Sequence, residues 1–156
     1  MPQSHSCGII IFMNKTIYTS ACAEDTFSIG AKLAQQAQPG DIYALCGDLG
    51  TGKTVFAKGF AEGLGIEEPV SSPTFTILQI YEDGRLPLYH FDVYRIEDPE
   101  EMEEVGLDEY LEGGGVCLIE WAERIEDMLP EGVIRITLEK DLQQGLSYRR
   151  VTVETP

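Results

Sequence analysis

The sequence predicts an α/β fold built on a mixed sheet. Segments in which apolar residues follow the helical period alternate with short apolar runs that suit buried strands. Two further pairs of strand-like segments flank glycine-containing turns and are typical of hairpins. Strands that alternate with helices, together with hairpins, indicate a mixed α/β sheet. A chain of 156 residues is long enough to bury one core without disulfides or metal, so we expect a single domain.

The N-terminal half predicts a helix, a strand and a second helix. Apolar residues recur at helical spacing over residues 25–37, and the QPG segment at 38–40 ends that helix. Residues 42–46 (IYALC) form a short apolar run that suits a strand covered on both faces. Residues 55–64 follow the helical period again until Gly65 ends the pattern.

A loop and a hairpin follow the second helix. The segment 71–73 (SSP) cannot comfortably be helical, because the residue before a proline is pushed toward extended conformations. Apolar residues alternate over residues 74–81 and 86–94, on either side of an Asp-Gly pair at 83–84. This pattern predicts an antiparallel hairpin.

The C-terminal half predicts a helix, a buried strand and a closing hairpin. The DPEE segment at 98–101 is a strong helix start, with a capping carboxylate, a proline and glutamates near the positive end of the helix dipole. Residues 116–120 (VCLIE) form another apolar run that suits a buried strand. Residues 133–138 and 148–153, joined through Gly145, predict the second hairpin.

The chain is strongly acidic, with 27 Asp and Glu against 11 Lys and Arg and a net charge of −16. Such a surface repels a phosphate backbone unless the few cations are gathered in one place, so direct, broad nucleic-acid binding is not expected. Residues 97–112 carry nine acidic residues and no Lys or Arg. This run is either a solvated helix face or a docking surface for a basic protein partner, and the sequence favours neither.

The cysteines predict neither a disulfide framework nor a metal site. They show no C-x-x-C spacing, and two of them lie in apolar runs where a thiol packs as a small hydrophobic group. The sequence contains only two histidines, so a zinc site of cysteine and histidine is not expected. We interpret the four as reduced and structural: Cys7, Cys22, Cys46 and Cys117.

The N-terminal segment predicts neither a membrane anchor nor a secretory signal. The apolar run at residues 9–13 is too short to span a membrane and lacks a basic leader, so we expect a cytoplasmic protein. Met13 is a candidate alternative start, which would make the first twelve residues dispensable. We predict that residues 1–18 form an N-terminal extension that could include a first strand, and that residues 19–156 form the domain.

The segment GDLGTGKT at residues 47–54, called the glycine-rich loop below, matches the phosphate-binding loop pattern. In this pattern glycines let backbone N–H groups converge on phosphates, lysine neutralises the outer charge, and the last hydroxyl binds magnesium. A strand precedes the loop and a helix follows, so the helix dipole would favour an anion there. The predicted phosphate-binding residues are Gly47, Asp48, Leu49, Gly50, Thr51, Gly52, Lys53 and Thr54.

Other residues are candidates for the same site. Nucleotide hydrolysis needs a carboxylate that organises magnesium, and Asp92 and Glu120 each end an apolar strand, although a strand-end acid can also be merely solvated. Thr74 is either a switch-like hydroxyl near the third phosphate or a plain turn residue. Trp121 either stacks on a base or packs in the core. His90 is interpreted as a strand histidine with a satisfied hydrogen bond rather than a catalytic base.

The motifs GDLGTGKT, SSPTFT, HFDVYR, DPEE and IEW occur in this order. With them the chain resembles the TsaE (YjeE) family from about residue 19 to the last hairpin. Members of this family are bacterial P-loop ATPases that assist formation of threonylcarbamoyladenosine on tRNA. The loop motif alone is shared by many NTPases, whereas SPTFT together with HFDVYR and IEW is far more specific.

The resemblance implies a P-loop fold with a parallel core, antiparallel hairpin additions and helices on both faces. It implies ATP and Mg²⁺ as ligands, slow hydrolysis by the isolated protein, and work on a TsaB–TsaD heterodimer, with tRNA contacted only indirectly. Lys53, Asp92 and Glu120 become the candidate catalytic residues, and Thr54 and Glu120 the candidate metal ligands. Thr74 and Trp121 fall in the family's other motifs and are candidate nucleotide contacts.

Two other functions remain open from the residues alone. A small-molecule kinase could use the same loop, but such enzymes generally need several cations to clamp a transferred phosphoryl group. Between Lys58 and Arg124 the chain offers only Arg85 and Arg95. The other alternative is a nucleotide-sensing module that does not hydrolyse its ligand.

Overall fold

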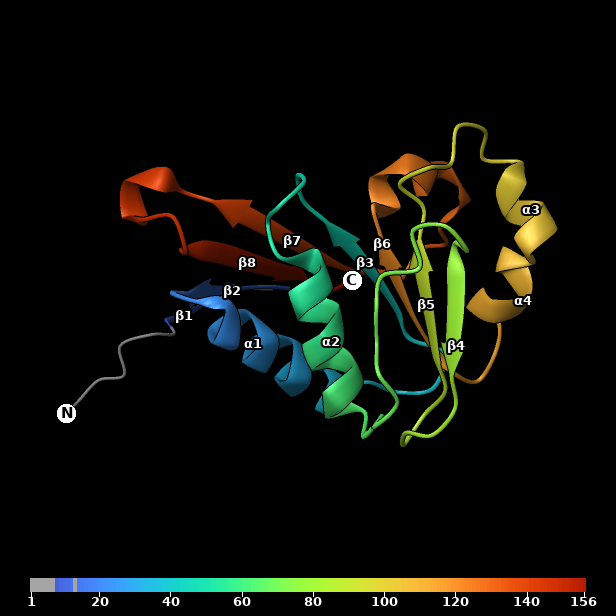
Figure 1. The fold of residues 1–156 in the computed structure, drawn as a ribbon, viewed down its shortest axis with the longest axis horizontal. Helices are drawn as coiled ribbons and strands as arrows, with labels where there is room; N and C mark the ends of the chain where they lie inside the picture. The colour runs from blue at the N-terminus through green and yellow to red at the C-terminus, as the bar shows by residue number, and fades with distance from the viewer. Residues whose placement is uncertain (1–7, 13) are drawn as a thin grey trace.

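The computed structural model describes residues 8–12 and 14–156, and in this part of the chain eight strands form one sheet (Figure 1). The strand order is β1-β2-β8-β7-β3-β6-β5-β4. The strands are β1 (Ile9–Phe12), β2 (Lys15–Ser20), β3 (Ile42–Cys46), β4 (Leu78–Tyr81), β5 (Leu88–Asp92), β6 (Val116–Glu120), β7 (Ile134–Lys140) and β8 (Arg149–Glu154).

The centre of the sheet is parallel and its edges are antiparallel. β3 pairs in parallel with both β6 and β7, and β5 pairs in parallel with β6. β4 closes one edge antiparallel to β5, and the β7–β8 hairpin extends through β2 and β1 on the other side. The prediction of a mixed α/β sheet with a parallel core and antiparallel additions is therefore confirmed.

Helices cover both faces of the sheet. The first face carries α1 (Ala23–Gln35) and α2 (Lys53–Gly63), which lie side by side in Figure 1. The second face carries α3 (Glu101–Val105), α4 (Leu107–Leu111) and the 3₁₀ segment η1 (Ala122–Met128). A short 3₁₀ turn, η2 (Leu142–Gln144), joins β7 to β8. Strands β3 and β6 contribute buried residues to both cores, which is why their sequences are apolar throughout.

Helices α1 and α2 approach closely because glycines face the partner backbone at three positions. A Cβ atom added at Gly59 would lie 2.7 Å from the carbonyl carbon of Phe27, and one at Gly63 would lie 2.8 Å from that of Ala31. On α1, a Cβ at Gly30 would lie 3.0 Å from the backbone nitrogen of Phe60. These separations are below normal van der Waals contact, so the helix pair accepts no side chain there.

The first hairpin is shorter than predicted. The segment 74–81 was expected to be a strand throughout, but β4 begins only at Leu78. The backbone N–H of Ile77 donates to the carbonyl of Pro73 at 2.7 Å and closes a turn. Ile77 itself has φ 69°, a left-handed conformation that β-branched residues rarely adopt. The strand pattern was therefore overridden by a tight turn, which holds residues 73–77 at the sheet edge.

The acidic run at 97–112 does not form the single helix that we expected. Gly106, with φ 86°, breaks it into α3 and α4. The helix starts later than predicted, since α3 begins at Glu101 and its N-cap residue, Glu100, makes no side-chain cap bond. Oδ1 of Asp98 instead accepts from the backbone N–H of Glu100 at 3.0 Å in the turn before the helix. Oε2 of Glu101 also accepts from the N–H groups of Glu97 and Asp98.

The sheet continues across the predicted boundary between residues 18 and 19. This boundary falls inside β2, which pairs with β8 from Lys15 to Ser20 and with β1 on its other side. Residues 9–12 thus form the edge strand of the same sheet. Met13 and residues 1–7, which include Cys7, lie outside the described residues. Among the helices that the structure describes, none is both long and apolar enough to cross a membrane.

The described cysteines are free thiols, as predicted. Burial raises the pKa of Cys46 to about 12, with Glu123 nearby adding to this effect. Burial alone raises the pKa of Cys117 to about 12. Because the thiolate is the reactive form, these shifts keep both groups inert at neutral pH.

Candidate functional site

The glycine-rich loop connects the central strand β3 to the N-terminus of α2. Gly47 has φ 147°, and a Cβ added there would lie 2.6 Å from the carbonyl oxygen of Leu138 and 2.8 Å from Oγ1 of Thr51. Gly52 has φ 103° and directly precedes the first residue of α2. Both positions favour glycine because their φ angles are positive, and at Gly47 the close approach of neighbouring atoms also excludes a side chain. The loop therefore turns the chain sharply from the strand into the helix.

Lys53 lies folded back over this loop. Its Nζ donates to the carbonyl of Gly47 at 2.5 Å and to that of Asp48 at 2.8 Å. The same atom is 3.9 Å from the centre of the Trp121 ring, a cation–π geometry. Burial lowers the pKa of Lys53, and the surrounding carboxylates, Glu120 foremost, oppose that shift. The lysine is 5% exposed, so its charge is concentrated at the base of the site.

The two candidate carboxylates lie side by side. Asp92 ends β5 and Glu120 ends β6, and these two residues are direct partners in the parallel register. On the other side of β6, Glu120 is the partner of Leu45 in β3, just before the glycine-rich loop. The carboxyl ends of parallel strands meet at one edge of a sheet, which brings both acids next to the loop. They are 4% and 2% exposed, respectively.

Asp92 is held by the segment that precedes β4. Its Oδ2 accepts from Oγ of Ser72 at 2.6 Å and from Oγ1 of Thr74 at 3.3 Å. Its Oδ1 accepts from the backbone N–H of Tyr94 at 3.0 Å, and its own N–H donates to the carbonyl of Ile77. Both carboxylate oxygens are thus occupied, and the loop that contains Ser72 and Thr74 is tied to the end of β5.

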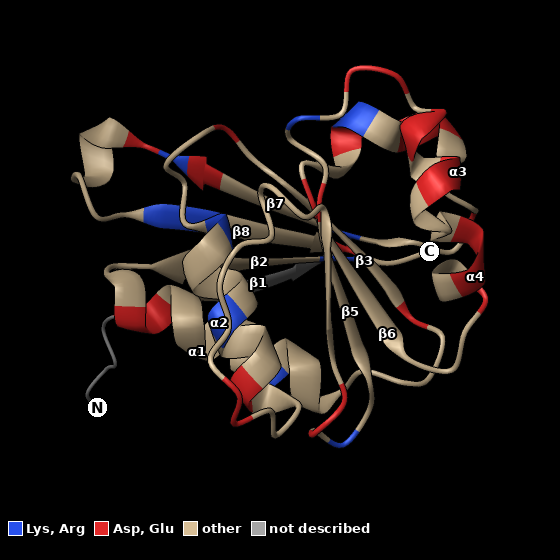
Figure 2. Cartoon of the chain, turned by 45° about the vertical axis from the view of Figure 1, so that its right-hand side comes forward, with Lys and Arg blue, Asp and Glu red and all other residues tan. Residues whose placement is uncertain are grey.

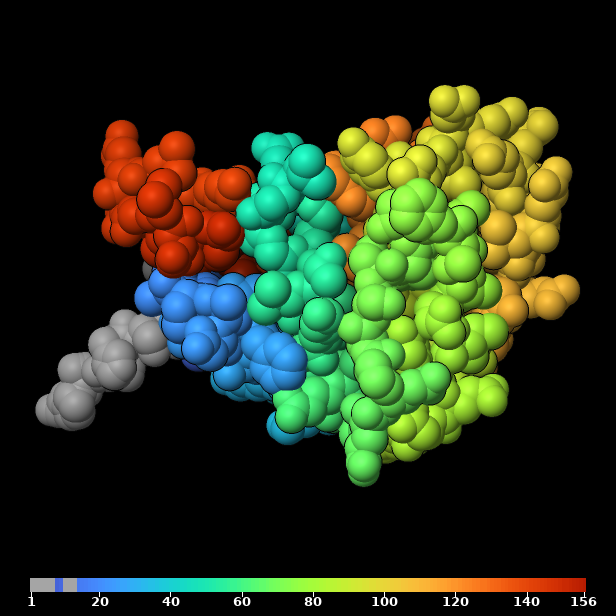
Figure 3. Space-filling model, viewed as in Figure 1, coloured from blue at the N-terminus to red at the C-terminus, as the bar shows by residue number. Residues whose placement is uncertain are grey.

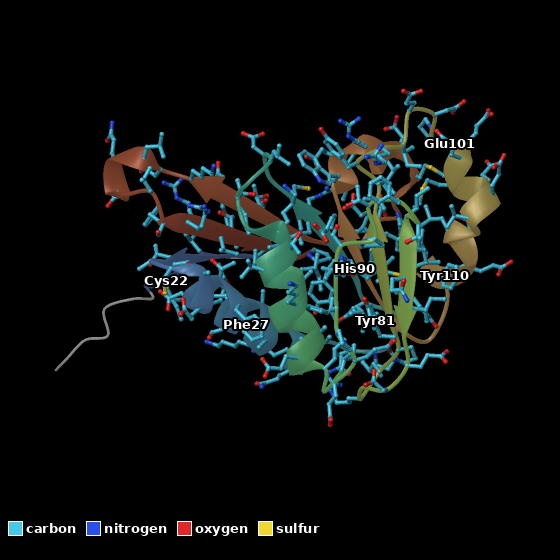
Figure 4. All side chains as sticks on the ribbon, viewed as in Figure 1. Cys22, Phe27, Tyr81, His90, Glu101 and Tyr110 are labelled. Atoms are coloured by element: carbon cyan, nitrogen blue, oxygen red, sulfur yellow. The ribbon has the colours of Figure 1, made fainter. Side chains whose placement is uncertain are left out.

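Glu120 contacts a buried histidine. Nε2 of His90, which lies in β5 beside α2 (Figure 4), is 2.6 Å from Oε2 of Glu120. His90 is 0% exposed. Nδ1 of the same ring is also buried, and it has no hydrogen-bond partner among the described residues. His90 is therefore a strand histidine with a hydrogen bond, as interpreted from the sequence, although its second ring nitrogen is unpaired in the described part of the chain.

Trp121 follows Glu120 in a left-handed conformation, with φ 63°. Its backbone N–H donates to the carbonyl of Leu45 at 3.0 Å. The ring lies under Lys53 and 4.7 Å from the ring of Tyr94, and it also packs against the core of the second face. A non-glycine residue with positive φ beside a charged site is the kind of strain that is retained for function.

Lys53, Asp92, Glu120 and Trp121 line one cavity of about 530 Å³. In Figure 3 the glycine-rich loop and α2 (teal) lie between the β7–β8 hairpin (red) and the segment that follows α2 (green). Three predicted residues face elsewhere, since Gly47, Asp48 and Thr51 line a second cavity of about 650 Å³ behind the loop. The predicted residues in the first cavity are Leu49, Gly50, Gly52, Lys53, Thr54, Thr74, Asp92, Glu120 and Trp121.

Four residues that line this cavity were not predicted as site residues: Val55, Ser72, Tyr94 and Arg149. Ser72 and Tyr94 lie within the quoted motifs SSPTFT and HFDVYR, and Val55 was predicted only as an apolar helix residue. Arg149 is 98 positions from Thr51, yet its Nε donates to the carbonyl of Thr51 at 2.9 Å and its Nη2 to that of Gly50 at 3.3 Å. Only the pairing of β8 beside β7 brings Arg149 to the loop, so no local pattern could have revealed it.

The fold and the site define an α/β protein with a glycine-rich loop of the phosphate-binding pattern, two carboxylates at adjacent strand ends and a buried lysine that lines the same cavity. A family model described as threonylcarbamoyl adenosine biosynthesis protein TsaE matches residues 20–151. The chain belongs to the TsaE family.

Relatives and a solved structure agree with this assignment. The chain is 57% identical over 117 residues to TsaE of Bacillus subtilis (strain 168), covering 75% of this chain and 73% of that protein. It is 46% identical over 119 residues to TsaE of Treponema pallidum (strain Nichols), covering 76% and 87%, respectively. The crystal structure of Bacillus subtilis YdiB matches with a TM-score of 0.77 and 43% identity, covering 97% of this chain and 88% of that one.

Proposed function

We propose that this chain is a cytoplasmic, magnesium-dependent ATPase that assists threonylcarbamoyladenosine formation on tRNA by acting on a TsaB–TsaD heterodimer. The pathway follows from membership of the TsaE family. The observation that supports ATP as the substrate is the convergence of Lys53, Thr54, Asp92 and Glu120 on one cavity. A lysine and a helix N-terminus attract phosphates, and a hydroxyl with carboxylates suits magnesium.

The donor set fits magnesium that is shared with a nucleotide. Within the described residues, no group of three or more His, Cys, Asp or Glu side chains could hold a metal by itself. Mg²⁺ keeps several waters and binds through one or two carboxylates plus substrate phosphates, so it does not need such a cage. Thr54 and Glu120 would hold the ion or its waters, and the bound ion would neutralise charge that develops on the phosphates.

The protein's own groups would supply position and charge. Lys53 would exchange its two loop carbonyls for the outer phosphates, and this exchange costs little because the ammonium is already desolvated. Arg149, which lines the same cavity, holds the loop through the carbonyls of Gly50 and Thr51. Asp92 keeps Ser72 and Thr74 at the rim of the cavity. A site built in advance in this way does not need to reorganise during the reaction.

One observation weakens the kinase alternative. Of the two candidate clamping cations, Arg85 donates through Nη2 to the carbonyls of Ala34 and Ala37 at the end of α1. It therefore serves as a helix cap. Of these two cations Arg95 is then left to clamp a phosphoryl group, and it is stacked on the ring of Phe75 with its guanidinium carbon 4.5 Å from the ring centre. One arginine is fewer than a kinase generally needs.

The test is phosphate release from ATP by the purified protein, without an acceptor, alone and with a TsaB–TsaD heterodimer. We expect slow release alone and faster release with the heterodimer. Nucleotide binding with no release in either case would identify the sensing module instead. Release that requires a small-molecule acceptor would identify a kinase.

Trp121 should report on nucleotide binding. It is the only tryptophan in the sequence, and its ring contacts Lys53, so movement of that ammonium toward phosphates should change the tryptophan emission on saturation with ATP or ADP. Adenosine, which lacks phosphates, is the control and should have a much smaller effect. An equal response to adenosine would support stacking on the base, and no response to any of the three would place the ring outside the site.

The acidic run at 97–112 should mediate docking. All nine of its carboxylates lie on exposed residues, and they gather on and around α3 and α4 (Figure 2). Such a surface accelerates association with a basic partner and is screened by salt. Changing Glu100, Glu101, Glu103 and Glu104 to Gln should weaken binding to TsaB–TsaD, mainly at low salt, while ATP binding by the isolated protein persists. Surface plasmon resonance at two salt concentrations measures this effect.

The matched control is a second set of four exposed glutamates, which lie near the C-terminal end of α2, in the loop that follows it and in the loop before β5: Glu62, Glu67, Glu68 and Glu82. Changing these to Gln alters the net charge by the same amount. If both variants lose affinity equally, the effect is one of total charge rather than of a docking surface. If neither loses affinity, the acidic run is a solvated face.

A further inference from the structure

The contact between His90 and Glu120 requires an explanation, because it joins two fully buried polar groups at the edge of the proposed ATP site. Nε2 of His90 and Oε2 of Glu120 are 2.6 Å apart, with 0% and 2% of their side chains exposed. Buried polar groups are costly unless they are hydrogen-bonded. Two apolar side chains could fill these positions without this cost, so the presence of a polar pair points to a role at the site.

The donor in this contact follows from the chemistry of the two groups. An ionised carboxylate can only accept a hydrogen bond, so Nε2 of His90 carries the proton. The carboxylate then has Oε2 engaged. Among the described residues no other hydrogen bond reaches the Glu120 carboxylate, so Oε1 has no partner there. Glu120 lines the cavity, and because His90 engages Oε2, Oε1 is the oxygen left to face it.

The second ring nitrogen excludes a different role. Nδ1 of His90 is buried and, within the described residues, has no hydrogen-bond partner. In the parallel register His90 lies opposite Leu118, and both strands bury leucines on this face. A histidine that relays protons needs a partner at each nitrogen. His90 is connected to Glu120 alone, so it can orient that carboxylate but cannot pass a proton onward.

We propose that His90 is a positioning residue whose Nε2–H fixes Oε2 of Glu120 and thereby directs Oε1 into the cavity. The two carboxylates of the site then have different tasks. Both oxygens of Asp92 are taken up by Ser72, Thr74 and the backbone of Tyr94. Glu120 keeps one oxygen free, and His90 determines its direction. The link to ATP hydrolysis rests on the proposed function, whereas the hydrogen bond itself does not.

The first test observes the hydrogen bond in the protein without nucleotide. The chain has two histidines, so ¹⁵N-histidine labelling of the His5→Ala variant leaves the ring of His90 as the single signal. We expect a proton on Nε2, with its resonance displaced in the Glu120→Ala variant. An Nε2 that carries no proton would overturn the proposal. So would an Nε2 resonance that is the same with and without Glu120.

The second test measures ATP hydrolysis by two variants at this position. His90→Leu removes the donor, and we expect kcat to fall about 10- to 100-fold, the usual effect of losing a group that orients a metal-linked residue. The KM for ATP should stay close to that of the parent. His90→Gln carries an amide N–H that can reach about the position of Nε2, and it should restore most of the lost rate.

The outcomes separate the positioning role from a packing role and from failure of the proposed function. Equal losses in His90→Leu and His90→Gln, with both variants folded, would show that the ring matters only for packing and would overturn the proposal. If His90→Leu does not fold, the rate of His90→Gln and the ¹⁵N spectrum of the labelled His5→Ala variant still test the proposal. If the parent hydrolyses no ATP even with TsaB–TsaD, the proposed function fails, while the ¹⁵N spectrum still decides whether His90 donates to Glu120.

Discussion

Lys53→Ala should weaken ATP binding about 10- to 100-fold and abolish hydrolysis, the fold remaining intact. The weakening corresponds to about 1.5–3 kcal/mol for one charge-assisted hydrogen bond. Lys53 sits at the start of α2, desolvated between the glycine-rich loop and Trp121, where its charge is least screened by water. Calorimetric titration with ATP gives the affinity, and phosphate release gives the rate.

Lys58→Ala provides the matched control for this substitution. Lys58 lies on the same helix but is exposed, so its removal changes the net charge and the helix composition in the same way. We expect parental affinity and rate from the control. If Lys53→Ala is folded and binds ATP as tightly as the control, Lys53 does not contact the nucleotide, and the glycine-rich loop has another task.

Gly59→Ala should lower the free energy of unfolding by about 3 kcal/mol, near the upper end of the usual effect of overpacking. The added Cβ would overlap the backbone of Phe27, 2.9 Å from its Cα and closer still to its carbonyl group. Backbone atoms cannot move aside as a side chain can, so α1 and α2 would have to separate. Urea unfolding followed by circular dichroism measures the change.

The control for this prediction is Gly114→Ala. A Cβ at Gly114 meets nothing within 4 Å, and its φ lies outside the left-handed region. This substitution should leave stability unchanged or raise it slightly, because alanine restricts the unfolded chain. A parental unfolding midpoint for Gly59→Ala would mean that the two helices are not packed as closely as the structure indicates.

The strand and loop residues of the site could be predicted because their signals are local. β3 and β6 have the bounds expected from their apolar runs, 42–46 and 116–120. A strand buried on both faces must be apolar at every position, and the run of apolar residues has the length of the strand. The glycine-rich loop is recognisable for a similar reason, since its backbone conformations restrict its sequence position by position.

The predictions failed where a local pattern competed with a turn. Residues 74–77 alternate like a strand, but the hydrogen bond from Ile77 to Pro73 closes a turn instead. The acidic run has helical character throughout, but Gly106 adopts a left-handed conformation and divides it. In both cases the tertiary position of the segment outweighed a weak local preference, as is usual for short elements.

The sequence by itself determined the class of fold, the identity of the glycine-rich loop and the two strand-end carboxylates. The tertiary structure alone decided which groups act on them. The strand order makes Asp92 and Glu120 neighbours, brings Arg149 to the loop from 98 positions away, and sets Nε2 of His90 against Glu120. These contacts join strands that are distant in the chain. Because a residue's own neighbours in sequence carry no record of such pairings, only the folded sheet shows that one carboxylate is fully engaged and the other is held with one oxygen free.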